Sequence, residues 1–269
     1  MSTPAIRRAF ADLAVGQIHY ASCGDVEAPA VLLLHQTPRS WAEYRDVLPL
    51  IGQRYRAIAM DTIGFGDSVV APWTPSIERW AAVAVELLDQ LGIRRAHVVG
   101  HHTGGVIAVE LAAAFADRVG ALVLSSTPFA NESFRRARAQ RPPIDAVESS
   151  ADGSHLAAMW RNRQSFYPAG RPELLEAFVL DALKVGADVE GGHRAVASYR
   201  MEDKIAHIRQ PTLLIRATHD PFAKDHPDEL RRHIAHARVV DIEGGMVPLP
   251  DQLPHAFAGA VLEFLDTVP

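Results

Sequence analysis

The segment Val98-Val99-Gly100-His101-His102-Thr103-Gly104-Gly105 joins a short apolar run to a stretch in which apolar residues recur at helical spacing. Its glycines allow the backbones of a strand and a helix to approach closely through a tight turn. The segment therefore predicts a strand-to-helix turn with His102 at its centre, although this glycine spacing alone is a weak signal.

The same rhythm of short apolar runs and helical stretches continues on both sides of this turn, which predicts an α/β fold. The apolar runs lack clean alternation, so we expect strands that are buried on both faces of a mostly parallel sheet. The predicted strands cover residues 17–22, 30–35, 56–61, 96–100, 121–125, 212–217 and 238–242. The predicted helices cover residues 77–91, 104–115, 228–236 and 254–265.

Residues 129–208 interrupt this rhythm, because they contain amphipathic helical pieces and no obvious strand. The segment is rich in arginine and includes Pro142-Pro143. It is too long for a structureless loop in a compact domain. We therefore predict a helical cap over residues 129–208, inserted into a core domain formed by residues 1–128 and 209–269.

Four motifs, in this order along the chain, resemble those of the α/β-hydrolase superfamily. Residues 35–38 (His-Gln-Thr-Pro) are similar to its oxyanion loop, and residues 61–68 to the structural loop after the next strand. Residues 100–104 resemble its nucleophile elbow, Gly-x-nucleophile-x-Gly. Residues 211–221 resemble the strand that delivers the catalytic acid, here Asp220. The resemblance implies the α/β-hydrolase fold, with a mostly parallel eight-stranded sheet, flanking helices and a cap.

The departures from that pattern carry the functional information. His102 stands where the family has a nucleophilic Ser, Asp or Cys, and Met246 stands where it has the triad histidine. The usual relay therefore cannot operate, because both the nucleophile and its activating imidazole are missing. Asp220 remains, and an imidazole on the elbow can meet it directly or through one water. We predict His102 as a general base and Asp220 as the acid that orients it.

Simpler interpretations of these residues stay open at this point. His102 can be the relic of an elbow that lost its activity, and Asp220 can be an Asp-Pro turn former. His101 is expected to pack behind the elbow, and His219 to be a wall residue of the pocket, rather than to react. Backbone N–H groups of Thr37 and Thr103 match the family's two oxyanion donors.

The pocket is predicted by position in the resembled pattern. Gln36 replaces a glycine of the oxyanion loop, so its side chain can enter the pocket, and Met246 can fill the space of the missing histidine. Cap residues are expected to form the opposite wall, although packing within the cap and salt bridges are simpler roles for them. Arg161 is a further candidate for a polar contact with the substrate. The predicted pocket residues are His35, Gln36, Arg39, Phe129, Trp160, His193 and Met246.

Composition excludes several other classes of function. The formal net charge is −5 at pH 7 without a basic run, which argues against nucleic acid as a partner. No apolar run approaches the ~18 residues of a membrane span. The single cysteine, Cys23, rules out an internal disulfide and fits a reducing cytoplasm. The spacing of the histidines near the elbow does not match that of metal ligands, so we expect no metal. We also expect no cofactor, a small-molecule substrate, and a monomer or homodimer.

The resemblance implies hydrolysis of a small hydrophobic ester, lactone or related carbonyl compound. Because the elbow has no serine, we expect water activated by His102 to attack the carbonyl. Attack by His102 itself, through an acyl-imidazole, is the less attractive route, since nothing obvious would act as its base afterwards. Two alternatives remain. The same base can abstract a proton beside a carbonyl, as in a lyase, decarboxylase or isomerase. The pocket can also be catalytically silent and bind a ligand, as in receptors built on this fold.

A first prediction concerns serine-directed probes. Because no serine occupies the elbow, a fluorophosphonate probe is expected to leave the site unlabelled, as mass spectrometry of the treated protein would show. An adduct on Ser125 or Ser126 would mean that the nucleophile lies elsewhere.

Overall fold

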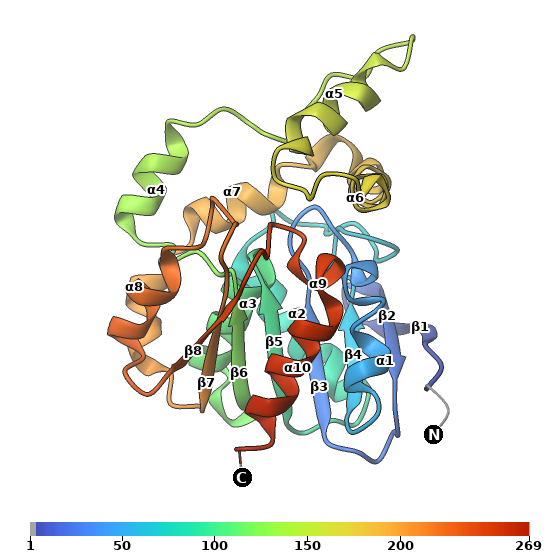
Figure 1. Cartoon of the computed structure of the whole chain (residues 1–269). Coiled ribbons are helices and arrows are strands. Elements are labelled where there is room, and N and C mark those ends of the chain that lie inside the picture. The colour runs from blue at the N-terminus through green and yellow to red at the C-terminus, as the bar shows by residue number, and fades with distance from the viewer. Residues whose placement is uncertain (1–3, 269) are drawn as a thin grey trace.

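The computed structural model describes residues 4–268, which form an eight-stranded sheet with helices on both faces (Figure 1). The strand order is β1-β2-β4-β3-β5-β6-β7-β8; β2 runs antiparallel to its neighbours, and the remaining pairs are parallel. This arrangement confirms the predicted fold. The strands are β1 (Arg7–Leu13), β2 (Gly16–Cys23), β3 (Ala30–Leu34), β4 (Arg56–Met60), β5 (Ala96–His101), β6 (Val119–Ser125), β7 (Thr212–Ala217) and β8 (Arg238–Ile242).

The two edge strands depart from the sequence prediction. No strand was predicted at β1, whose segment is rich in charged residues and is mostly exposed. Residues 238–242 do form a strand, β8, but most of them are exposed and not buried on both faces. Inner strands β3 and β6 are buried throughout. An apolar run thus reliably marks the buried centre of this sheet, but it misses the edge strand β1 and overstates the burial of β8.

Helices cover the two faces of the sheet. Apolar residues of α2 and α3 belong to one buried cluster, whereas those of α1 and α10 belong to another on the opposite face. No helix among residues 4–268 is long and apolar enough to cross a membrane. The helices of the core domain are α1 (Leu48–Ile51), α2 (Ile77–Gln90), α3 (Thr103–Ala114), α8 (His226–His233), α9 (Leu249–Gln252) and α10 (Pro254–Leu265).

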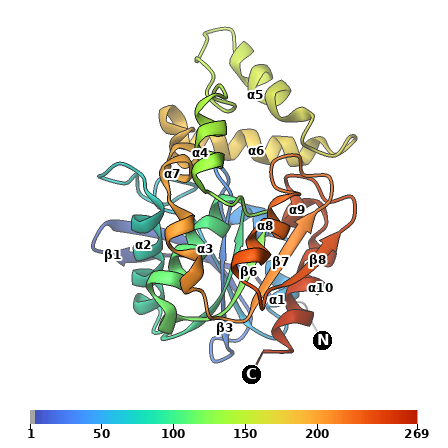
Figure 2. The same cartoon turned by 90° about the vertical axis from the view of Figure 1, so that its left-hand side faces the viewer.

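Four more helices lie beyond the carboxyl ends of the parallel strands (Figures 1 and 2). They are α4 (Glu132–Ala139), α5 (Ser154–Gln164), α6 (Pro172–Val185) and α7 (Gly191–Ser198). All four fall within residues 129–208, and α5 and α6 share a small apolar cluster that includes Met159 and Phe178. We refer to residues 129–208 as the cap; its status as a separate unit stays a prediction.

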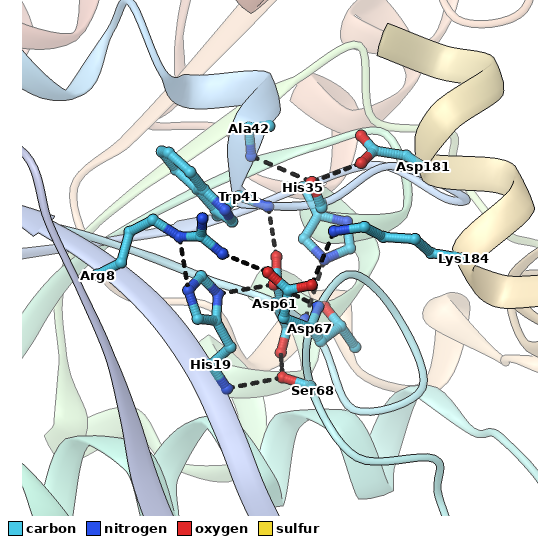
Figure 3. A network of polar contacts seen from close by, with 12 residues as sticks. Arg8, His19, His35, Trp41, Ala42, Asp61, Asp67, Ser68, Asp181 and Lys184 are labelled. Atoms are coloured by element: carbon cyan, nitrogen blue, oxygen red, sulfur yellow. Dashed lines mark hydrogen bonds and ion pairs between the residues drawn. The ribbon is translucent and has the colours of Figure 1, made fainter.

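The loop at residues 61–68 makes polar contacts with both the sheet and the cap (Figure 3). Asp61 is fully buried and accepts hydrogen bonds from the backbone N–H groups of Trp41 (2.6 Å) and Asp67 (2.9 Å). The ring of His19, on β2, lies 2.8 Å from the same carboxylate. Asp67 in turn pairs with Lys184 of α6 at 2.7 Å. One loop therefore joins the sheet to the cap.

The turn between β5 and α3 positions His102. This residue has φ 47° and ψ −112°, a left-handed backbone that is costly for a residue with a Cβ. Two residues later, a Cβ placed on Gly104 would lie 1.9 Å from the carbonyl oxygen of Leu34. Only glycine allows the first turn of α3 to approach β3 this closely.

The close approach at Gly104 leads to a stability prediction. Gly104→Ala forces the backbones of β3 and α3 apart and should lower the free energy of unfolding by about 3 kcal/mol, the upper part of the range for overpacking. Gly259→Ala is the matched control, since Gly259 lies in α10 with open space around it; it should be stabilising by about 0.5–1 kcal/mol. Urea unfolding measures both, and equal effects would contradict this account of the elbow.

Candidate active site

His102 lies on the floor of a cavity of about 430 Å³ between the core and the cap. Its backbone N–H donates to the carbonyl of Ser125 at 3.0 Å, which fixes the elbow against β6. The side chain is 14% exposed. The strained turn therefore presents an imidazole to an enclosed space.

Asp220 lies beside this imidazole, at the turn that follows β7. Nε2 of His102 is 2.8 Å from Oδ2 of Asp220, a close charge contact without the alignment of a hydrogen bond. The carboxyl group is fully buried, and its Oδ1 accepts a 2.9 Å hydrogen bond from the N–H of Phe222. Burial raises the pKa of Asp220, but the neighbouring His102 ring outweighs burial and holds this pKa below its usual value. The structure thus brings the two predicted catalytic residues together.

The predicted oxyanion donors lie on the same floor. Thr37 and Thr103 both line the cavity. Within residues 4–268, neither backbone N–H donates to a protein acceptor. The N–H of Thr103 is also at the first turn of α3, where the helix dipole favours negative charge.

Two neighbouring histidines have structural roles. His101 is fully buried; its Nε2 donates to the carbonyl of Val247 at 2.8 Å and its Nδ1 accepts from the hydroxyl of Ser125 at 3.0 Å. Burial lowers the pKa of His101 to about 3, so it stays neutral. His35 donates to the carbonyl of Gln36 at 2.7 Å and accepts the N–H of Thr62 at 3.0 Å. His219 is not among the residues that line the cavity, and 61% of its side chain is exposed.

Gln36 lines the cavity and is anchored by a buried acid, Glu43. The backbone N–H and the Nε2 of Gln36 donate to the two carboxylate oxygens at 2.9 and 2.5 Å. Burial raises the pKa of Glu43 to about 7, although Arg39 opposes this. Glu43 therefore holds the oxyanion loop from behind.

The cap wall of the cavity contains a second histidine–aspartate contact. Nε2 of His193, on α7, lies 2.8 Å from Oδ2 of Asp145. Arg163, on α5, makes a two-point ion pair with the same carboxylate at 2.6 and 2.5 Å. Burial raises the pKa of Asp145, but Arg163 and His193 prevail and lower it to about 2. The carboxylate is fully buried, whereas 22% of the His193 side chain is exposed.

Five of the predicted pocket residues do not line the cavity. His35 packs behind the oxyanion loop, as described above. Arg39 is fully buried and pairs with Asp181 (2.9 Å) and Asp251 (2.5 Å), so it links α6 to α9 instead of facing substrate. Phe129 is buried against the ring of His233. Trp160 packs on the internal cluster of the cap.

Met246 is the fifth. Its backbone N–H donates to Oε1 of Gln252, and the cavity is lined by the next residue, Val247. The carbonyl of Val247 accepts from His101 at 2.8 Å, which places this loop against the elbow. Gln36 and His193 are the predicted pocket residues that do reach the cavity.

Sequence reasoning missed most of the cap wall. Pro142-Pro143 and the arginine-rich composition were visible signals, but they do not say which side chains face inward. Arg163 lines the cavity, whereas the candidate Arg161 is exposed. The lining residues that the sequence did not place at the pocket are Phe134, Arg138, Arg141, Pro142, Pro143, Ile144, Asn162, Arg163, Val196, Phe222 and Val247; Pro128 and Phe166 line it as well.

Two groups in the described part of the chain have the composition of metal ligands. One comprises His19, Asp61 and Asp67, and the other Asp145, Glu190 and His193. Each already contains a guanidinium, since Arg8 pairs with Asp67 and Arg163 with Asp145. Arginine thus supplies positive charge to both groups of carboxylates.

Comparison with known proteins gives the family context. A family model described as the alpha/beta hydrolase fold matches residues 29–246. Epoxide hydrolase 2 of Siraitia grosvenorii is 43% identical over 115 residues, covering 42% of this chain and 36% of the relative. Haloalkane dehalogenase 2 of Mycobacterium tuberculosis (strain ATCC 25618 / H37Rv) is 36% identical over 119 residues, covering 44% and 41%. The matches thus span less than half of the length of these relatives.

Solved structures resemble nearly the whole chain. A hydrolase from Pseudomonas aeruginosa PA01 has a TM-score of 0.77 at 26% identity, over 96% of this chain and 98% of that one. The enol-lactonase from Burkholderia xenovorans LB400 has a TM-score of 0.80 at 24% identity, over 96% and 100%. These likenesses show that core and cap together follow a known fold.

The raised pKa of Glu43 leads to a prediction about stability and pH. A carboxyl group whose pKa rises from 4.5 to about 7 on folding stabilises the fold at low pH, and this contribution is lost as the pH rises through about 7. Unfolding free energies measured from pH 4 to 9 should therefore fall more steeply in the wild type than in Glu43→Gln, by up to about 3 kcal/mol. Parallel profiles would contradict the assignment.

Proposed function

The chain belongs to the alpha/beta hydrolase fold family, and we propose that it is an enzyme that hydrolyses a small, largely hydrophobic ester, lactone or related carbonyl compound. Relatives and structural neighbours that include an epoxide hydrolase and an enol-lactonase support hydrolysis of a small molecule. The cavity supports an apolar substrate, because Phe134, Phe166 and Phe222 contribute to its walls.

One observation carries the proposal: the 2.8 Å contact between His102 and Asp220 on the cavity floor. A lowered pKa keeps Asp220 ionised at neutral pH. The negative charge favours a proton on the adjacent Nε2, and the lone pair of the neutral ring is then on Nδ1. Nδ1 makes no hydrogen bond to a protein atom among residues 4–268.

In the proposed reaction, Nδ1 of His102 takes a proton from a water molecule as the water oxygen attacks the substrate carbonyl. Asp220 stabilises the imidazolium that forms. The N–H groups of Thr37 and Thr103, each pre-positioned by the fold, donate hydrogen bonds that stabilise the negative charge developing on the carbonyl oxygen. As the tetrahedral intermediate collapses, the carbon–oxygen bond to the leaving group breaks and its electron pair stays on the leaving oxygen. Protonation of that oxygen gives the alcohol, and the acid is released beside it.

The role of His102 is tested by substitution. His102→Ala should lower kcat/KM for activated esters by about 10²–10⁴-fold, the range for loss of a general base, with little change in thermal stability. His219→Gln is the matched control, because His219 adjoins Asp220 in sequence but is exposed. Full activity in well-folded His102→Ala would overturn the proposal.

The role of Asp220 is tested by the pH dependence of the rate. Only neutral imidazole accepts a proton, so activity should fall as the pH drops through the pKa of the base. Asp220→Asn removes the negative charge that favours imidazolium, and the acidic limb of kcat/KM should move to lower pH with a lower plateau. An unchanged profile would contradict a role for Asp220.

Products that contain no oxygen from water would indicate proton abstraction instead of hydrolysis, and tight binding without turnover would indicate a binding protein.

A further inference from the structure

The cap carries a second imidazole that faces the same cavity as His102. His193 occupies the first turn of α7, and Val196 lines the cavity one turn further along the helix. A Cβ placed on the preceding residue, Gly192, would lie 2.1 Å from Oγ1 of Thr37. The start of α7 is therefore packed directly on the oxyanion loop, and His193 follows that contact by one residue.

His193 is held by a network of charged residues, most of them buried. Its Nε2 lies 2.8 Å from the buried carboxylate of Asp145, and Nη2 of Arg163 lies 3.3 Å from the same ring nitrogen. Glu190, at the start of α7, accepts the backbone N–H groups of residues 144, 145 and 146 and so holds Asp145 in place. Arg138 of α4 pairs with Glu190 at 3.2 Å.

The two ring nitrogens of His193 have different environments. Nε2 faces both the Asp145 carboxylate, which accepts, and the Arg163 guanidinium, which can only donate. In the protonated ring, Nε2–H faces Asp145 and Nδ1 carries the second proton. Nδ1 makes no hydrogen bond to a protein atom among residues 4–268, and the residue lines the cavity. The carboxylate faces Nε2, as at His102, but here Arg163 shares that carboxylate. Nδ1 is left for another partner and is the nitrogen from which a protonated ring can donate.

We propose that His193 is the general acid that protonates the leaving group, with Asp145 as its positioning residue. The inference rests on the proposed hydrolysis. As the carbon–oxygen bond of the tetrahedral intermediate breaks, its electron pair passes to the alcohol oxygen, which takes the Nδ1 proton of protonated His193. His102 has gained a proton from water and His193 has lost one, and exchange with solvent restores both.

The substitution His193→Gln separates this role from a structural one. The Nε2 of glutamine can reproduce the donor that faces Asp145, whereas nothing in glutamine replaces Nδ1. His155→Gln is the matched control, since His155 is a cap histidine outside the cavity that contacts Ser150. Thermal unfolding of both variants reports on the integrity of the cap.

The experiment compares two esters of the same acid, p-nitrophenyl butyrate and ethyl butyrate. A p-nitrophenolate leaves without protonation, but an ethoxide does not, so His193→Gln should lower kcat/KM about 10²-fold for the ethyl ester and less than about threefold for the other.

The outcomes distinguish the two proposals. Equal loss on both esters, or no loss on either, in a folded His193→Gln protein overturns the role of His193 and leaves hydrolysis intact. Dependence on His193 with no dependence on His102 overturns the proposed base. Absence of turnover of either ester by the wild type counts against both.

Discussion

The left-handed backbone of His102, at φ 47° and ψ −112°, is the constraint on which the rest of the site depends. Such a conformation costs about 1–3 kcal/mol and persists only where the surrounding structure enforces it. Here α3 is packed against β3 at Gly104, and the N–H of His102 is bonded to β6. The same turn that strains the backbone directs the imidazole into the cavity and leaves the N–H of Thr103 without a helical partner.

A second constraint is the seating of the cap, because one wall of the cavity belongs to it. Arg39 links α6 to the core through Asp181, and Gly192 places α7 on Thr37. The floor brings His102 and Asp220 together, and the wall adds His193. Catalysis in this cavity therefore requires that the cap and the core are correctly placed against each other. Loss of the Arg39–Asp181 ion pair, or of the contact between Gly192 and Thr37, is expected to affect catalysis as well as stability.

Sequence reasoning reached the residues whose positions depend on local spacing. Glycines around His102 and the strand before Asp220 predict where these two side chains emerge, and the structure places them 2.8 Å apart. It failed where the outcome depends on packing between distant elements. Arg39 was expected at the pocket, but two acids from α6 and α9 hold it inside the protein. Arg163 lies inward and Arg161 outward because of the phase of α5 against the cap, which the sequence pattern does not reveal.

The central claim is that His102 activates water directly and forms no covalent bond with the substrate. Stopped-flow measurement of p-nitrophenol release from p-nitrophenyl butyrate tests this most directly. The enzyme concentration must be high enough for one equivalent of product per enzyme molecule to be detected. Direct attack by water releases acid and alcohol in the same turnover, so the account predicts a linear trace without a burst. A burst equal to the enzyme concentration, the kinetic signature of an acyl-enzyme, would contradict it.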